Sequence, residues 1–211
     1  MNNVLYYVHD PMCSWCWGFE ATKNQLFNCL PDTLRIKRLL GGLAVDNDQP
    51  MPDDMQLHLQ KTWHRIEDQI PGVKFNFDFW RNCRPRRSTY PACRAVIAAR
   101  QQGSDHDEVM TASIQQAYYQ EARNPSDNAT LIELAEETGL DTRLFSRDLL
   151  SDVTQQSLLQ EIHLSRELHA NSFPSLVLKV ADSVCSVTID YNDASPMLEL
   201  IEMLLDQGLR R

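Results

Sequence analysis

Val4-Leu5-Tyr6-Tyr7-Val8 is the first apolar run of the chain, and it leads through His9-Asp10-Pro11-Met12 into Cys13-Ser14-Trp15-Cys16. Five consecutive apolar residues are typical of a strand that is buried on both faces. From Cys13 onward the apolar residues recur at helical spacing until Pro31, and a second strand-like segment covers residues 34–40. This order predicts a strand–helix–strand unit with parallel strands and a right-handed crossover.

The middle of the chain has a different pattern, because apolar residues recur at helical spacing in almost every segment. We expect helices at 55–70, 92–102, 105–122, 129–138, 142–150 and 152–169. Apolar residues alternate with polar ones from Val73 to Phe79, which indicates an extended segment whose aromatic rings pack in the core. Ser88 or Thr89 is the candidate cap of the helix at 92–102.

The C-terminal part of the chain returns to strands. Segments 175–180 and 184–189 flank a short turn and predict an antiparallel hairpin, and a last helix follows Asn192 or Asp193. The predicted order is therefore β-α-β, a helical stretch, and β-β-α. We assign the chain to the α/β class with a thioredoxin fold. Residues 1–45 and 171–211 are expected to complete one sheet, and residues 46–170 to form a large all-helical insertion.

The composition limits the classes of function. The 211 residues include 20 Lys and Arg against 29 Asp and Glu, for a net charge of -9. Such an acidic chain is a poor candidate for binding nucleic acid, which depends on cations that neutralise phosphates. The longest apolar run, Leu39–Val45, is too short to span a membrane. The N-terminus has neither the cationic nor the long apolar region of a secretory signal, so we expect no membrane partner and a cytoplasmic location.

Cys13 and Cys16 stand apart from the other cysteines because their spacing allows a small disulfide ring or a shared metal. A structural zinc site needs four ligands, usually from a second pair at tight spacing. The chain has no such second pair. Its histidines include pairs six residues apart, which lie about 120° apart on a helix and fit a surface better than a metal site. We therefore expect no metal and no separate cofactor at this motif.

The remaining four cysteines fit other roles. In a reducing compartment the ordinary cysteine is a small buried apolar residue, and we expect this of Cys29 and Cys185. Cys83 and Cys93 are ten residues apart beside a basic stretch that contains Arg86-Arg87. Whether these two are buried thiols or a second redox pair stays open at this point.

Cys13 is the expected nucleophile. At the start of a helix, unpaired amide N–H groups and the helix dipole favour the thiolate, which is the reactive form in disulfide exchange. Cys16 lies one turn further in and faces the core, so its thiol should be buried and harder to ionise. We predict that Cys13 attacks a substrate disulfide and that Cys16 resolves the mixed disulfide. Ser14 is placed to donate a hydrogen bond to the Cys13 thiolate, and Trp15 to cover the surface or touch a bound peptide.

Two residues that precede the motif are candidate modulators. A charged Asp10 would disfavour the thiolate, and a protonated Asp10 could relay a proton to Cys16. The alternative is that Asp10 only shapes the turn between strand and helix together with Pro11. The role of His9 is open in the same way, because it directly follows the first strand.

Phe173-Pro174 follows a predicted helix and opens the predicted hairpin. X-Pro bonds are cis in only about 5–6% of folded cases, and an ordinary proline at the start of a strand is the alternative. In a thioredoxin sheet, however, a cis-proline loop faces the redox pair. We therefore expect a cis bond here, and we expect the backbone of Phe173 to pair with an extended substrate as an added strand.

The string Asp10-Pro11-Met12-Cys13-Ser14-Trp15-Cys16-Trp17-Gly18-Phe19, together with the first strand and Phe173-Pro174-Ser175, resembles the DsbA family of thioredoxin-fold proteins. The resemblance is to its FrnE-like branch of predicted protein-disulfide isomerases, and it covers essentially the whole chain. It implies a thiol–disulfide oxidoreductase that oxidises, reduces or isomerises disulfides of proteins or peptides. By this resemblance Cys13 is the nucleophile, Cys16 the resolving thiol and Pro174 the cis-proline. The stretch Arg86–Pro91 resembles a segment that faces the active site; a solvated basic turn is the alternative.

Two other functions stay open. Kappa-class glutathione transferases and hydroxychromene-carboxylate isomerases share this fold, so a glutathione-dependent isomerase or transferase is the first alternative. Those relatives typically have a serine where Cys13 stands and lack the resolving thiol, so the intact pair favours the oxidoreductase. Glutathione remains a candidate redox partner in either case. The second alternative is a non-catalytic binding module whose cysteine pair holds zinc or is inert.

Overall fold

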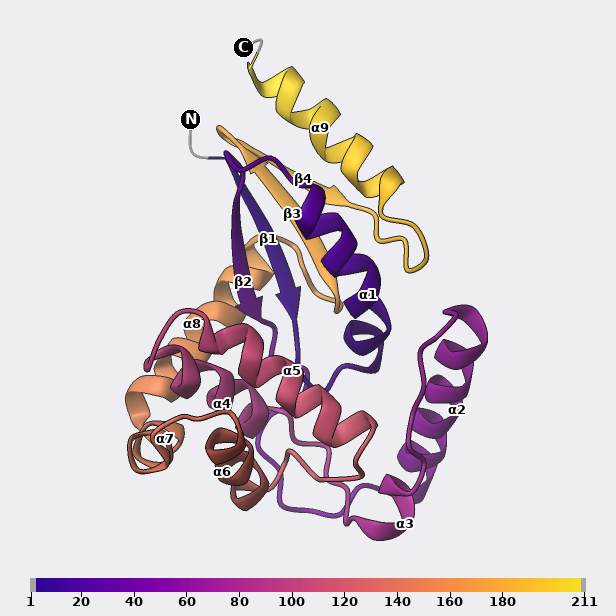
Figure 1. Cartoon of the computed structure of the whole chain (residues 1–211), viewed down its shortest axis with the longest axis vertical. Helices are drawn as coiled ribbons and strands as arrows, with labels where there is room; N and C mark the ends of the chain where they lie inside the picture. Colours follow the sequence, from indigo (N-terminus) through magenta and orange to yellow (C-terminus); the bar gives the residue numbers. More distant parts are fainter. Residues whose placement is uncertain (1–2, 210–211) are drawn as a thin grey trace.

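The computed structural model describes residues 3–209, in which strands occur only near the two ends of the chain. The four strands are β1 (Val4–His9), β2 (Arg35–Leu40), β3 (Ser175–Val180) and β4 (Ser183–Val187). The nine helices of this described part are α1 (Ser14–Cys29), α2 (Asp53–Gln69), α3 (Phe79–Asn82), α4 (Tyr90–Arg100), α5 (His106–Tyr119), α6 (Asn128–Glu137), α7 (Thr142–Leu149), α8 (Asp152–Glu167) and α9 (Ser195–Leu209). The element order is therefore the predicted β-α-β, helices, and β-β-α (Figure 1).

The four strands form one sheet in the order β2-β1-β3-β4. β1 pairs in parallel with β2, with Val8 opposite Leu39, and antiparallel with β3, with Val8 opposite Ser175. β3 and β4 form the antiparallel hairpin. The N-terminal and C-terminal segments thus share a sheet although a long helical segment separates them, as the sequence predicted.

Each face of the sheet has its own core. Leu5 and Tyr7 of β1 are buried on the side of α1 and α9, together with Phe19 and Leu26 of α1. Val8 is buried on the other face, where the chain around the end of α8 covers it. Side chains of a strand alternate between the faces of a sheet, so both faces need apolar residues when helices cover both. This explains the unbroken apolar run that begins the chain.

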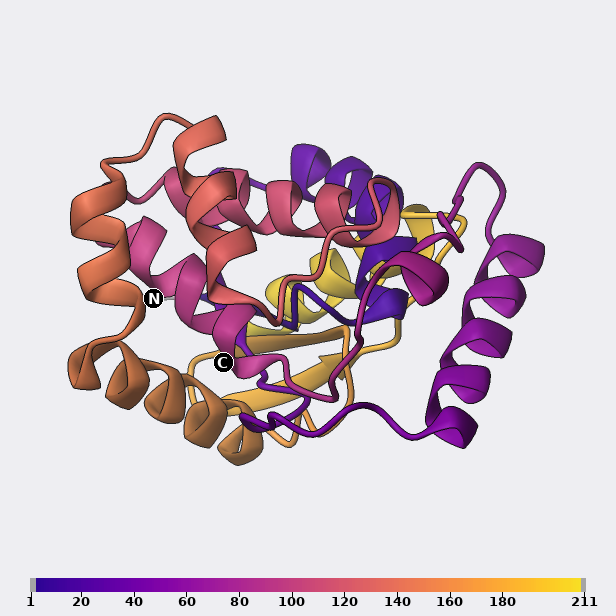
Figure 2. The same cartoon turned by 90° about the horizontal axis from the view of Figure 1, so that it is seen from below.

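The helical segment has a core of its own, centred on α4 and on Trp63 of α2. The ring of Trp63 is fully buried and stacks on Phe75, with Phe79 and Tyr119 also in contact. Figures 1 and 2 show α2 on the opposite side of the molecule from α6, α7 and α8. The aromatic rings attach this outlying helix to the rest of the chain.

Residues 73–76 are irregular, a turn follows at Phe77, and α3 begins at Phe79. The rings of Phe75, Phe77 and Phe79 pack around Trp63 in the core, as the sequence predicted. One expectation about the cysteines was wrong. Cys29 is exposed at the last position of α1 and Cys185 is only partly buried on β4, so neither is the buried residue that was expected.

Candidate active site

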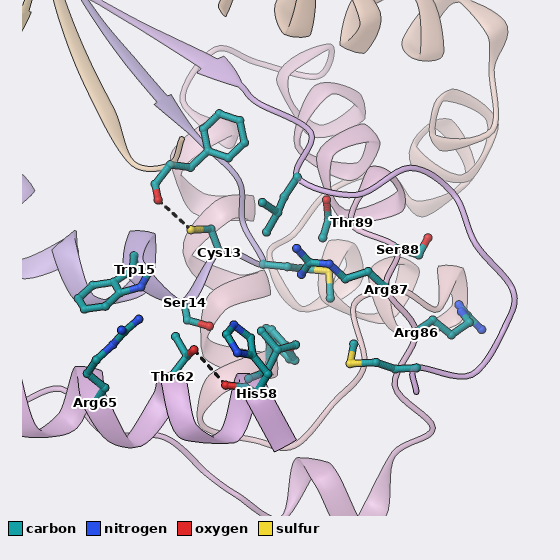
Figure 3. A pocket seen from close by; sticks show the side chains of 16 residues that line it. Cys13, Ser14, Trp15, His58, Thr62, Arg65, Arg86, Arg87, Ser88 and Thr89 are labelled. Atoms are coloured by element: carbon teal, nitrogen blue, oxygen red, sulfur yellow. Dashed lines mark hydrogen bonds between the residues drawn. The ribbon is translucent and has the colours of Figure 1, made fainter. Parts of the chain in front are cut away.

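Cys13 occupies the N-cap position of α1, where its backbone is still extended. Its N–H donates to the carbonyl of Asp10, and its own carbonyl accepts from the N–H groups of Cys16 and Trp17. The side chain is only 6% exposed, and its thiol donates to the carbonyl oxygen of Phe173 at 3.3 Å (Figure 3). The peptide bond between Phe173 and Pro174 is cis. Residues 160 positions apart in the chain are thus brought together at the end of the sheet.

Cys16 lies beneath Cys13 in the first turn of the helix and has no exposed surface. Burial raises the pKa of the Cys16 thiol well above its usual value, and a hydrogen bond with Cys13 raises it further. Both cysteines are free thiols in this structure. The pair therefore combines one thiol at the helix start with a second, protonated thiol in the core.

Gly41 leaves the space that the ring of Phe173 occupies. A Cβ atom at Gly41 would lie 2.1 Å from two ring carbons of Phe173, so any side chain there would displace the ring. The ring also packs against the core cluster that contains Val8 and Leu39. The end of β2 therefore helps to set the position of the loop that faces Cys13.

Asp10 is a fully buried carboxyl group under the motif. Its oxygens accept hydrogen bonds from Met12 N–H at 2.8 Å, Leu43 N–H at 2.7 Å and the Thr89 hydroxyl at 2.6 Å. The thiol of Cys93 also donates to it at 3.5 Å. Burial raises the pKa of Asp10, whereas these four donors lower it. Burial is the larger effect, so the pKa of Asp10 stays above its usual value despite the four hydrogen bonds, which fix the carboxyl group within the turn before Cys13.

The hydroxyl of Thr89 explains why the expected helix cap is absent. Thr89 is at the N-cap position of α4, but its side chain makes no cap hydrogen bond. It donates to Asp10 and accepts from Ala44 N–H at 3.0 Å instead. The helical segment is therefore joined directly to the turn that precedes Cys13.

Ser14 does not make the hydrogen bond that was expected of it. Its Oγ atom accepts from the indole N–H of Trp63 at 2.9 Å, and the side chain is buried. Trp15 is partly exposed, with the guanidinium of Arg65 5.2 Å from its ring centroid and the ring of Tyr191 at 5.0 Å. The two residues between the cysteines are thus held by α2 and by the loop before α9.

A cavity of about 230 Å³ opens beside Cys13. It is lined by the residues of Cys13–Trp15, by Phe173, by one face of α2 and by residues 86–89 (Figure 3). Arg86 forms an ion pair with Asp127 at 2.8 Å. Within residues 3–209, Arg65 and Arg87 have no ion-pair partner. The mouth of the cavity therefore carries positive charge on an acidic chain, and the basic stretch contributes to it.

His9 lies away from this cavity. Its side chain is 1% exposed and stacks on Tyr7 with a centroid distance of 4.8 Å. Burial, together with the positive charges of Lys23, Arg38 and Arg100, lowers the pKa of His9 from 6.5 to about 3. His9 is therefore neutral near pH 7 and is not one of the groups that surround Cys13.

Several groups at the site were not found from the sequence. Trp63, Arg65 and His58 come from α2, and Thr89 and Cys93 from α4 or its start. The sequence signal for Trp63 was a tryptophan on the apolar face of a predicted helix, because a buried indole N–H usually has a hydrogen-bond partner. The thiol of Cys83 donates to the carbonyl of Ala122, while that of Cys93 donates to Asp10, so the two thiols have separate partners.

No group of three or more His, Cys, Asp or Glu side chains in residues 3–209 is arranged to hold a metal ion. Within the same residues, the helices are all too short or too polar to cross a bilayer.

A four-stranded sheet, a cysteine pair at the start of α1, and a cis-proline loop against the first cysteine define a thioredoxin-fold protein with a helical insertion. The chain belongs to the thioredoxin family, because the family model described as Thioredoxin matches residues 6–197. Its fold is that of the DsbA-like members of this class.

Solved structures share the fold over nearly the whole chain. A candidate protein disulfide isomerase from Nitrosomonas europaea is 26% identical with a TM-score of 0.85, and the match covers 98% of this chain and 99% of that one. The cytosolic disulfide reductase DsbM from Pseudomonas aeruginosa is 24% identical with a TM-score of 0.72 and 98% coverage of both chains. DsbM has also been solved with GSH; that structure is 23% identical with a TM-score of 0.70, and the match covers 99% of this chain and 100% of that one.

The curated relatives are longer proteins that match this chain over part of their length. The ClpXP adapter protein SpxH of Bacillus subtilis is 26% identical over 176 residues, which are 82% of this chain. SpxH of Halalkalibacterium halodurans is 23% identical over 177 residues. The match spans only 56% and 57% of these two relatives.

Proposed function

We propose that the protein is a thiol–disulfide oxidoreductase that uses Cys13 and Cys16 as its redox pair. The observation that carries the proposal is the contact of Cys13 Sγ with the carbonyl of Phe173 at 3.3 Å, with Cys16 fully buried one turn below. A substrate strand that adds to the Phe173 backbone would bring its sulfur beside Cys13. The likeness to a disulfide reductase and to a candidate disulfide isomerase supports this activity.

The reaction needs two exchange steps. The Cys13 thiolate attacks one sulfur of a substrate disulfide, forms a mixed disulfide, and releases the other sulfur as a thiolate. Cys16 then loses its proton to solvent or to the released thiolate and attacks the sulfur of Cys13, which releases the second substrate thiol. The pair is oxidised by two electrons and the substrate disulfide is reduced to two thiols. The reverse sequence oxidises a substrate dithiol.

Cys16 is suited to the second step by its environment. Its raised pKa keeps it protonated, so it does not compete with Cys13 for the substrate disulfide. Once Cys13 is in a mixed disulfide, the negative charge that disfavours the Cys16 thiolate is gone. Asp10 acts on Cys16 in both directions, because its backbone lowers the pKa of Cys16 through a hydrogen bond and its negative charge raises it.

Glutathione is the redox partner that the cavity favours. It carries two carboxylates and a thiol, and the cavity beside Cys13 offers the guanidinium groups of Arg65 and Arg87, which form no ion pair in the described part of the chain. The structure of DsbM with GSH supports the same partner for this chain. The cytosolic description of DsbM also supports a cytoplasmic location. Because the chain spans little more than half of the SpxH proteins, we do not extend their adapter role to it.

Reduction of insulin disulfides tests the proposal. Activity with glutathione or dithiothreitol as reductant should be lost in Cys13→Ser. Cys16→Ser should accumulate a mixed disulfide on Cys13, which peptide mass spectrometry locates. Cys29→Ser is the matched control, because Cys29 is exposed at the far end of α1 and should leave activity unchanged. Activity that survives Cys13→Ser, or an adduct found on Cys93 instead, would contradict the assignment.

A further inference from the structure

A second cavity, of about 200 Å³, lies beside the middle of α1, at Glu20, Lys23 and Asn24. The sheet contributes Tyr7, His9 and Arg38, and α1 contributes Lys23. Helix α5 closes it with Thr111 and its neighbours. Neither Cys13 nor Cys16 lines this cavity, so its occupant would be separate from the proposed disulfide substrate.

Within residues 3–209, two buried polar side chains that line this cavity have no hydrogen-bond partner. Both ring nitrogens of His9 are inaccessible and unpaired, and the side chain is 1% exposed. The hydroxyl of Thr111 is also unpaired, and Thr111 is 8% exposed. Buried polar groups are normally hydrogen-bonded, because an unpaired one costs about 1–3 kcal/mol. His9 lies on a strand and Thr111 on a helix far apart in the chain, and both residues line the same cavity.

The charged groups around the cavity leave an excess of hydrogen-bond donors. Lys23 is 7% exposed, and in the described structure its ammonium donates only to Glu20, so two of its three donors are free. Arg38 donates to Glu108, which is more than half exposed at the rim. Both carboxylates are thus already engaged by the two cations. The positive charges of Lys23 and Arg38 also help to keep His9 neutral.

We propose that this cavity binds a small carboxylate, held between Lys23 and Arg38 with hydrogen bonds from His9 and Thr111. A carboxylate has one negative charge and two acceptor oxygens, which match a site rich in free donors where each cation already has one carboxylate partner, Glu20 or Glu108. A phosphate dianion fits less well, since it would need more unpaired positive charge than the cavity provides. Neutral His9 can donate one N–H to such a ligand at pH 7.

Titration with sodium acetate tests the site. Ionic strength is held constant with sodium chloride, and binding is followed by NMR through the imidazole nitrogens of ¹⁵N-labelled His9. Saturable shifts of the His9 resonances by acetate are expected. Thr111→Val keeps the shape of the side chain and should weaken acetate binding by about tenfold or more, as expected for the loss of a hydrogen bond to a charged group. Circular dichroism confirms that the variant is folded.

Two further variants separate this cavity from the cavity beside Cys13. Thr62→Val makes the same substitution in the cavity beside Cys13 and should leave the affinity for acetate unchanged. Arg65→Gln removes an unpaired cation there and should also leave it unchanged. The proposal is overturned if the His9 resonances shift equally with chloride, or if their shifts with acetate do not saturate, which would show that the cavity holds only water. It is also overturned if Arg65→Gln abolishes acetate binding. Inorganic phosphate that binds more tightly than acetate would overturn the ligand class.

Discussion

The burial of neutral His9 has a measurable consequence for stability at acid pH. In the unfolded chain His9 titrates near 6.5, whereas in the folded protein its pKa is about 3. A lowered pKa in the folded state means that His9 contributes stability above pH 6.5, and that this contribution is lost as the pH falls from 6.5 toward 3. At about pH 4.5, two units below the unfolded value, the loss is about 3 kcal/mol. A domain is stable by roughly 5–15 kcal/mol, so the effect is a large fraction of the total.

The substitution His9→Phe isolates this contribution. A phenyl ring preserves the stack on Tyr7 but cannot take up a proton. Urea unfolding is measured for both proteins near pH 7.5 and near pH 4.5, in buffers free of small carboxylates. Carboxyl groups titrate in both proteins, so their effects cancel in the comparison. Wild type should lose about 3 kcal/mol more than His9→Phe over this interval. Equal losses would show that His9 is not held neutral, and the description of its surroundings would then be wrong.

Two substitutions test the contacts between the helical segment and the cysteine motif. Thr89→Val removes the hydroxyl that donates to Asp10, and urea unfolding should show that the free energy of unfolding falls by about 1–3 kcal/mol. Thr89→Ser retains the hydroxyl and should retain most of the stability. Similar losses in both variants would contradict the role of this hydrogen bond. Trp63→Phe removes the indole N–H that donates to Ser14, and it should cost about 1 kcal/mol more than Trp80→Phe in the same aromatic cluster. The indole N–H of Trp80 is buried without a partner in the described structure, so an equal or larger loss for Trp80→Phe would refute the reasoning.

The parts of the fold that the sequence predicted depend on local patterns. The apolar run from Val4, the helical spacing after Cys13, and the two short segments around residue 181 each reflect contacts with one neighbouring layer. The alternating aromatic residues at 73–79 were expected to pack in the core, and they do. Their shared partner, Trp63 of α2, could not be identified from the alternation, because it depends on how two separate segments pack together.

In the candidate site, too, contacts that follow from the fold order could be predicted and contacts that depend on helix packing could not. Cys13 and Phe173 could be paired from the sequence because the fold order implied that the helix start and the proline loop meet. The contact of Trp63 with Ser14 could not, since it depends on where an outlying helix packs. Cys29 was misjudged because it lies on the last turn of α1, where the helix surface is turned to solvent.

The position of β1 in the middle of the sheet has a consequence for synthesis on the ribosome. Its neighbour β2 is made soon afterwards, but β3 is made only after residues 41–174. At roughly 5–20 residues per second, this interval lasts about 7–27 s. During that time the nascent β1 has an open edge of unpaired backbone groups, which is the kind of surface that molecular chaperones protect and that mispaired chains exploit.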